Sequence, residues 1–354
     1  MKFALVGPPQ SGKSTLFAAI TGRRPDVAHG VMEHLASVMV PDSRLDYLAS
    51  LYNPKKFTPT HLDFLDIPGC SLADAAGQAA FRKAMTSVRK CDGIVFVVRA
   101  FQSDSVVAYR NRIDPKKDLD ELHAELIFAD LEQVTNRIEK LEKSVLKPTK
   151  TRDAELRELA MMKRVHAALE KEAPVSSEIT NDEERQIATS FGFLTLKPVI
   201  VVVNVGETEM TQPAPFEHAH AKATIALSAE IEAEIAQLDP ADRPAFLGDL
   251  GLKEPAGIRL IQTCYTAVGL ISFLTCGPDE VRAWTIHNGD TAVEAAAKIH
   301  SDIARGFIRA ETVAFDDLKA NTDMKGAKNA NKVRLEAKAY VVKDGDIINF
   351  RFNV

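Results

Sequence analysis

The chain has 354 residues, of which 45% are hydrophobic and 26% are charged, so it is long enough to bury large cores in two or three domains. A net charge of −5 excludes a protein coated by nucleic acid over its whole surface, although it permits a local basic patch. The four cysteines form no CxxC pair, and no apolar run approaches the roughly 18 residues that span a bilayer. We therefore expect a monomer of the reducing cytoplasm, without a disulfide framework, a cysteine-based zinc site or a membrane segment.

Apolar runs alternate with helical patterns in the first part of the chain. The run Lys2–Val6 has the length of a buried strand and stops at Gly7, and the helical spacing of the following segment, Lys13–Ile20, indicates a helix. Further strand-like runs are Leu62–Leu65, Ile94–Val98, Val199–Val203 and the shorter Thr224–Leu227. Strands separated by helices favour a parallel sheet covered on both faces, so we predict an α/β fold with a doubly wound sheet.

A coiled-coil pattern interrupts this alternation between the third and fourth runs. Apolar residues recur there in steps of four and three, and Pro148 separates the first helical repeat from a second one. The predicted seam residues are Ile127, Leu131, Val134, Ile138, Leu141 and Val145, followed by Leu156, Leu159, Met162, Val165 and Leu169. We predict an inserted antiparallel helical hairpin, and the alternative is a pair of helices that simply cover the sheet.

The sequence changes character again from about Val281. A strand-like run, Val281–Ile286, leads through Asn288-Gly289-Asp290 to a helical pattern at Ala292–His300. The apolar run Tyr340–Val342 is then followed by a turn signal, Lys343-Asp344-Gly345-Asp346. These short elements predict a small α+β domain at the C-terminal end.

The first strand and helix enclose a phosphate-binding motif. Gly7-Pro8-Pro9-Gln10-Ser11-Gly12-Lys13-Ser14 matches GxxxxGK[ST] without a gap, in the strand-to-helix context that the motif requires. The glycines let backbone N–H groups face the α- and β-phosphates, and Lys13 is expected to reach the β- and γ-phosphates. We expect the Ser14 hydroxyl to bind Mg²⁺ and Thr15 to complete the nucleotide-binding segment.

A second motif, Asp66-Ile67-Pro68-Gly69, follows the strand Leu62–Leu65. At the carboxyl end of a parallel sheet the Asp66 carboxylate can hold the metal through water, and the Gly69 N–H can contact the γ-phosphate. Asp-x-Pro-Gly is also a common turn, but its place after a phosphate-binding loop and a strand favours the nucleotide interpretation.

Base recognition is expected at two further loops. Asn204-Val205-Gly206-Glu207 follows the strand Val199–Val203, where a GTPase carries Asn-Lys-x-Asp and its aspartate reads guanine. Val205 replaces the lysine and Glu207 is one methylene longer than aspartate, so we expect weakened guanine selectivity; an acidic turn after a strand is the alternative. Ser228-Ala229-Glu230 is expected to close over the base.

With these motifs in place, the chain resembles the Obg-related YchF family of ribosome-associated P-loop ATPases over nearly its full length. The resemblance rests on the phosphate-binding loop, DIPG, FLTLKP leading into NVGE, SAE, and the segments VRAWTI, GFIRA and NFRFNV near the C-terminus. It implies a nucleotide-binding domain of residues 1–112 and 195–277, a coiled-coil insertion of residues 113–194, and a ubiquitin-like (β-grasp) TGS domain of residues 278–354. It also implies ATP accepted at least as well as GTP through Asn204 and Glu207, with the ribosome or ribosomal RNA as partner.

The chain departs from the family pattern in both switch regions. The segment Gly22–Val40 is short and contains no threonine to complete the magnesium shell, and Ser37 is a poor substitute. Switch II, Ser71–Gln78, retains only Gly77 of the family's glycines, and Cys70 stands where Ras-like proteins have a water-orienting glutamine. We therefore expect slow hydrolysis, on the order of 10⁻⁴ per second without an activating partner.

Several features stay open on the sequence alone. Cys70 is either an exposed thiol or a small apolar spacer, and His218 and His220 either chelate a metal weakly or lie on a solvated helix. Residues 319–343 hold seven basic and two acidic residues, which give a local net charge of +5 and either an RNA-facing patch or a solvated face. The alternatives to the ATPase switch are a GTP-preferring GTPase, a binding module that does not turn over its nucleotide, and a P-loop kinase. The kinase is the weakest of them, because this chain has no obvious arginine-rich lid.

Overall fold

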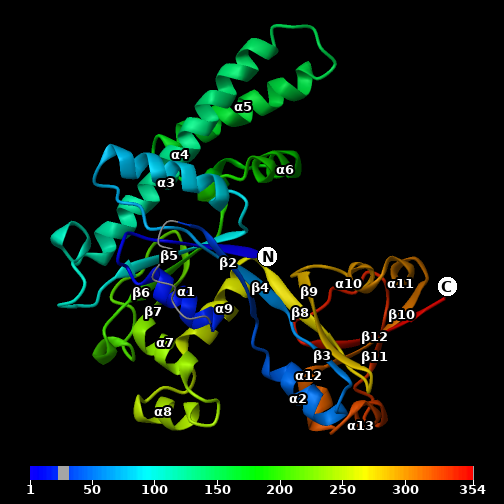
Figure 1. The fold of residues 1–354 in the computed structure, drawn as a ribbon. Helices are drawn as coiled ribbons and strands as arrows, with labels where there is room; N and C mark the ends of the chain where they lie inside the picture. Colours follow the sequence, from blue (N-terminus) through cyan, green and yellow to red (C-terminus); the bar gives the residue numbers. More distant parts are fainter. Residues whose placement is uncertain (23–31, 354) are drawn as a thin grey trace. The chain divides into compact units, whose positions relative to one another are not determined.

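The structure, a computed structural model, describes residues 1–22 and 32–353 (Figure 1). These residues divide into two units, one formed by Met1–Ala36 with Asp63–Gly257 and the other by Ser37–Leu62 with Ile258–Val354. In the described residues, no helix combines the length and the apolar character that crossing a membrane would need.

The first unit is built on a six-stranded sheet of order β2-β4-β1-β5-β6-β7. Its strands are β1 Lys2–Val6, β2 His34–Met39, β4 His61–Asp66, β5 Gly93–Arg99, β6 Val199–Asn204 and β7 Ala221–Leu227. Neighbouring strands from β4 to β7 pair in parallel. This confirms the strand-like runs and the doubly wound α/β prediction, while β2 was not predicted.

Both faces of this sheet are buried. In β5 every residue is buried, and alternate residues Ile94, Phe96 and Val98 join one core cluster while Val95 and Val97 point to the opposite face. That cluster also contains Phe81 of α3 and Leu119 of α4. The helices of this unit are α1 Lys13–Thr21, α3 Ala75–Val88, α4 Pro115–Ser144, α5 Arg152–Leu169, α6 Asp182–Phe191, α7 Ala229–Gln237 and α8 Arg243–Asp249. Short 3-10 helices lie at Tyr109–Asn111, Val175–Glu178, Leu194–Leu196 and Glu207–Glu209 (η5).

Helices α4 and α5 form the predicted antiparallel hairpin, which projects from the sheet in Figure 1. Its own core contains Ile127, Val134 and Leu141 of α4 packed with buried residues of α5, and Leu131 and Ile138 are partly buried against it. Pro148 lies in the connection between the helices, as predicted. The prediction was wrong for Leu156, which is 41% exposed because α5 contributes to the shared core mainly through its later turns, from Leu159 to Leu169.

The second unit is a mixed sheet of order β11-β10-β12-β8-β9-β3 with short helices. Its strands are β3 Lys56–Thr58, β8 Leu270–Thr275, β9 Glu280–His287, β10 Phe307–Ala314, β11 Arg334–Glu336 and β12 Asp346–Phe352. Its helices are α2 Ser43–Tyr52, α9 Ala256–Ala267, whose first two residues belong to the first unit, α10 Ala292–Ile299, α11 Ser301–Arg305, α12 Phe315–Ala320 and α13 Met324–Asn329. The strand expected at Val281–Ile286 and the helix expected from Ala292 are present. The run Tyr340–Val342 forms no regular strand, because only Val341 pairs, in an isolated bridge with Thr291.

The segment 37–62 runs from the second half of β2 to the start of β4 and belongs to this second unit, whereas the sequence placed it in the nucleotide-binding domain. Leu45 and Leu48 of α2 are fully buried in a cluster with Val281 of β9 and Val313 of β10. Strand β3 adds to the sheet beside β9. The sequence boundary at residue 278 also falls after β8, which is already part of the C-terminal sheet.

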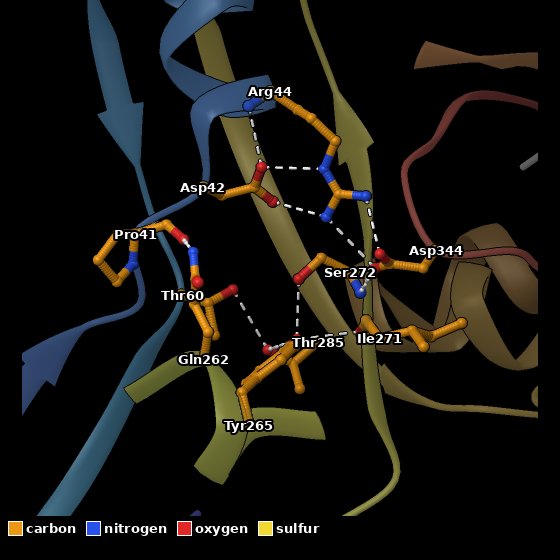
Figure 2. A network of polar contacts seen from close by, with 10 residues as sticks. All are labelled: Pro41, Asp42, Arg44, Thr60, Gln262, Tyr265, Ile271, Ser272, Thr285 and Asp344. Carbon is orange, nitrogen blue, oxygen red and sulfur yellow. Dashed lines mark hydrogen bonds and ion pairs between the residues drawn. The ribbon is translucent and has the colours of Figure 1, made fainter. Parts of the chain in front are cut away.

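A polar network fastens this segment to the C-terminal sheet (Figure 2). The Arg44 guanidinium donates to both Asp42 and Asp344, at 2.8 Å to each at its shortest. These residues line a cavity of about 530 Å³, and the Tyr265 hydroxyl is 2.8 Å from Ser272 Oγ and donates to the Ile271 carbonyl oxygen. These groups bond to one another, so the network holds parts of the second unit together.

Candidate functional site

The phosphate-binding loop joins the carboxyl end of β1 to the amino end of α1, in the first unit. Its glycines have no room for a side chain: a Cβ at Gly7 would lie 2.3 Å from the Val97 carbonyl oxygen, and one at Gly12 would lie 2.0 Å from Asn204 Nδ2. Gly12 also has φ of +86°, a conformation that side-chain-bearing residues avoid. Close packing against β5 and β6 therefore fixes the path of the loop.

A buried ion pair lies where this loop meets β4. Lys13 Nζ is 3.1 Å from Asp66 Oδ1, and both side chains are almost fully buried, at 5% and 6% exposure. The Ser14 hydroxyl donates to Asp66 Oδ2 at 2.9 Å. The structure thus brings the predicted lysine, serine and aspartate together at one point.

The donors at this point fit magnesium. A serine hydroxyl and an aspartate carboxylate are the hard oxygen ligands that Mg²⁺ prefers, usually together with several waters and phosphate oxygens. Ser11 Oγ is buried and makes no hydrogen bond within the protein, and Asp66 Oδ1 makes none beyond its ion pair with Lys13. The described residues contain no group of three or more histidine, cysteine or acidic side chains arranged to hold a metal.

The second motif lies directly against the loop. A Cβ at Gly69 would be 3.1 Å from Pro9 Cα, so the Asp66–Gly69 turn packs closely on the backbone of Pro8 and Pro9. The next residue, Cys70, is half-buried and its Sγ donates to the Pro68 carbonyl oxygen at 3.5 Å. Burial raises the pKa of the Cys70 thiol, although Lys13 opposes this, so the thiol stays neutral near pH 7 and cannot replace a water-activating base.

Asn204 joins the loop to the segment Ser228–Glu230, which the sequence predicted to close over the base. It is buried at the end of β6, where its Nδ2 donates to the Ser11 carbonyl oxygen and its Oδ1 accepts from the Ala229 N–H, both at 2.9 Å. Ser228 is the N-cap of α7, its hydroxyl accepting from the Ile231 N–H. The sequence predicted Asn204 as a nucleotide contact but did not reveal this double hydrogen bond, because its partners lie 193 and 25 residues away.

The other residues predicted to bind nucleotide differ in how far their side chains are exposed. Gln10, Ser14, Glu207 and Glu230 are exposed, and Thr15 and Pro9 are partly buried. Val205 is 5% exposed and packs into the main core cluster, so its side chain belongs to the protein interior. Glu207 begins the 3-10 helix η5 just beyond it.

Known proteins are similar in sequence to this chain over its whole length. The "Ribosome-binding ATPase YchF" of Bacillus subtilis (strain 168) is 40% identical over 363 residues, which cover 99% of this chain and 98% of the relative.

The chain belongs to the YchF family.

Other comparisons agree with this membership. The "Ribosome-binding ATPase YchF" of Escherichia coli O157:H7 is 35% identical over all of this chain and 99% of the relative. The solved structure of the Schizosaccharomyces pombe YchF GTPase superposes with a TM-score of 0.82 at 29% identity, covering 99% of this chain and 97% of that one. Residues 2–145 match the family MMR_HSR1, described as 50S ribosome-binding GTPase, and residues 270–353 match YchF-GTPase_C, described as a protein of unknown function (DUF933).

In this YchF-family chain the structure describes all of switch II but only part of switch I. Residues 23–31 of the predicted switch I, Gly22–Val40, lie outside the described residues, and Ser37 is exposed in the middle of β2. In switch II, a Cβ at Gly77 would lie 1.8 Å from the Ser71 carbonyl oxygen. Asp74 caps α3 by accepting from the Gly77 N–H at 2.8 Å, so Gly77 is needed for the turn that starts α3.

Proposed function

We propose that this chain binds ATP or GTP with Mg²⁺ at the Gly7–Ser14 loop and hydrolyses it slowly as a ribosome-associated switch. The buried Lys13–Asp66 pair with the Ser14 hydroxyl carries the proposal. With Mg²⁺ bound, the Ser14 hydroxyl and the Asp66 carboxylate would hold the ion, and a triphosphate would supply anionic oxygens for Lys13. The names of the relatives support both the hydrolysis and the ribosome as partner.

A binding module with little turnover is the second candidate, and Cys70 is the observation in its favour. Its neutral, half-buried thiol offers no group to orient the attacking water. Single-turnover hydrolysis of ATP, measured with and without ribosomes, distinguishes the two. Hydrolysis that ribosomes accelerate supports the switch, whereas release of intact ATP in both conditions supports the binding module.

We expect ATP to bind at least as tightly as GTP. Val205 is held in the core and so offers no lysine stem along the base, and the exposed Glu207 is longer than the aspartate that reads guanine. Titration calorimetry with both nucleotides and Mg²⁺ measures this directly. A GTP preference above about tenfold, or roughly 1.4 kcal/mol, would contradict the expectation.

Glu207→Asp gives an internal check on this preference. The shorter carboxylate restores the GTPase-like length, so we expect a shift of a few-fold toward GTP, while Thr208→Ala in the same short helix leaves the ratio unchanged. Val205→Lys is unsuitable for this purpose because it would place a charge in the core.

We further propose that the tip of the α4–α5 hairpin contacts ribosomal RNA. Lys147, Lys150 and Arg152 are exposed there beside Leu146, which is 82% exposed. The basic stretch 319–343 is a weaker candidate, because Lys332 pairs with Asp317 at 3.0 Å and Arg334 pairs with Glu336 at 3.0 Å. Paired cations release fewer counterions when they meet phosphate.

Cosedimentation with ribosomes across a salt series tests the hairpin tip. Lys147→Ala with Lys150→Ala is expected to weaken binding and to reduce the log–log salt slope by about one unit for each phosphate group that the tip no longer binds. Lys116→Ala with Lys117→Ala, in the first turn of α4 and so far from the tip, is the matched control and keeps the parent slope. If both pairs of substitutions behave like the parent, the tip is solvated surface.

A further inference from the structure

A tyrosine outside the nucleotide-binding motifs contacts the start of switch II. Tyr109 opens the 3-10 helix Tyr109–Asn111 (η2), in the connection between β5 and α4. Its hydroxyl oxygen accepts a hydrogen bond from the Leu72 N–H at 2.8 Å. Leu72 is 7% exposed, lies two residues after Cys70 and packs into the main core cluster. A buried backbone N–H needs a partner, and here a side chain 37 residues further along the chain supplies it.

The connection that carries Tyr109 is held in one shape. Arg99, at the end of β5, is 4% exposed, and its guanidinium donates to three backbone carbonyl oxygens of the loop 101–107 at 3.0 to 3.4 Å. The two residues that follow Tyr109, Arg110 and Asn111, both have φ of +53°. This left-handed conformation is unfavourable for residues with side chains, so it persists only where the surrounding contacts impose it. The protein therefore fixes the backbone on both sides of Tyr109.

The same connection is fastened to the first turns of α4. Arg110 Nη1 donates to Glu121 Oε1 at 2.9 Å, and the Arg110 guanidinium also lies over the Tyr109 ring, 5.3 Å from its centroid. Arg112 donates to Glu121 at 3.1 Å and to Asp118 at 2.8 Å, and the Asp118 side chain is 3% exposed. These contacts hold Tyr109 in place between switch II and the base of α4.

The Tyr109 hydrogen bond lies between two other points that fix this part of the chain. On one side, the Asp66–Gly69 turn packs on Pro9 of the phosphate-binding loop. On the other side, Asp74 caps α3. Between them, the Leu72 N–H is bonded to a residue of a different element, so the segment 70–73 has a fixed point of its own. That segment begins directly after Gly69, whose N–H is expected to contact the γ-phosphate.

We propose that Tyr109 is a positioning residue for nucleotide hydrolysis: its hydroxyl holds the start of switch II, so that the Gly69 N–H and the attacking water keep a productive arrangement at the γ-phosphate. This inference rests on the proposed function. The Cys70 thiol donates to the Pro68 carbonyl oxygen, so the backbone of this segment must supply much of that arrangement. Catalysis by prearranged donors weakens when the donors are free to move, and Tyr109 limits that movement through the Leu72 N–H.

The test is Tyr109→Phe in the full-length chain, which removes one hydroxyl and keeps the ring beneath Arg110. We expect the single-turnover rate constant of ATP hydrolysis, at saturating ATP and Mg²⁺, to fall by about tenfold or more. The Kd for ATP, measured by calorimetry, should change by less than about twofold, because the hydroxyl contacts switch II and not the phosphate-binding loop. Hydrogen exchange of the Leu72 amide should become faster by about tenfold or more, since its hydrogen-bond acceptor is gone.

Tyr340→Phe is the matched control. The Tyr340 hydroxyl donates to Asp346 at 2.7 Å and accepts from Arg334 at 3.0 Å, all within the second unit. Its removal should leave both the hydrolysis rate and the exchange of the Leu72 amide at the parent values.

The outcomes separate this inference from the function on which it rests. If the parent hydrolyses ATP and Tyr109→Phe does so at an equal or higher rate, the positioning role is overturned and the proposed function stands. If the parent hydrolyses no ATP, with or without ribosomes, both fail. A rate that falls together with ATP affinity and melting temperature would also overturn the inference, because Tyr109 would then serve only the stability of the fold.

Discussion

We expect Lys13→Ala to weaken triphosphate binding by about 100-fold or more, because it removes the cation that we propose contacts the β- and γ-phosphates. It will also lower the free energy of unfolding of the nucleotide-free protein. Lys13 and Asp66 are both buried and 3.1 Å apart, and removing one partner of a buried ion pair costs about 3–5 kcal/mol since the other charge is left unpaired. Titration calorimetry measures the first effect and chemical denaturation the second.

The control for this variant is another lysine-to-alanine change in an ion pair. Lys163 pairs with Glu142 on the hairpin surface, where both side chains are about half exposed. Lys163→Ala should therefore change the unfolding free energy by less than about 1 kcal/mol and leave nucleotide affinity as it is. Parent-like nucleotide affinity in Lys13→Ala would remove the assignment of the phosphate-binding loop.

Gly12→Ala is expected to disrupt both the loop and its link to the base-recognition segment. The added Cβ would lie 2.0 Å from Asn204 Nδ2, so Asn204 must move and give up its hydrogen bonds to Ser11 and Ala229. The left-handed backbone at Gly12 adds roughly 1–2 kcal/mol of strain for alanine. We expect nucleotide affinity to fall at least tenfold and the melting temperature to drop.

Gly248→Ala is the matched control, measured by the same calorimetry and thermal unfolding. Gly248 lies in α8 with no atom within 4 Å of its added Cβ, so alanine there is neutral or slightly stabilising. If Gly12→Ala bound nucleotide as well as Gly248→Ala does, close packing around Gly12 would have no part in forming the site.

Local patterns made the meeting of Lys13, Ser14 and Asp66 predictable from the sequence. The strand, loop and helix around Gly7–Ser14 are contiguous, and Asp66 follows its strand directly, so residue types and spacing were enough to bring Lys13, Ser14 and Asp66 together. The same holds for the heptads of α4, whose regular steps report the buried face of a helix.

Features that depend on distant contacts were not predictable. Strand β3 has only three residues, too few to show a periodicity, and it pairs with β9 more than two hundred residues away. The sequence of helix α2 has the pattern of an ordinary amphipathic helix. Only the burial of its leucines against Val281 and Val313 assigns it to the second unit. Leu156 fits the heptad, yet its side chain is 41% exposed and lies outside the core that α4 and α5 share.

Helix α4 runs through two cores without interruption. Its early residues Leu119, Leu122 and Leu126 pack into the sheet cluster that also contains Phe81 of α3, and Ile127 onward pack into the hairpin. With proline only at its first position and no glycine, its 30 residues span about 45 Å as one stiff rod. The first turns of α4 are therefore buried beside α3, the helix that follows the Asp66–Gly69 turn, while the rest of α4 extends into the hairpin. A partner that pulls on the tip exerts its torque on that core, with no flexible joint in between to absorb it.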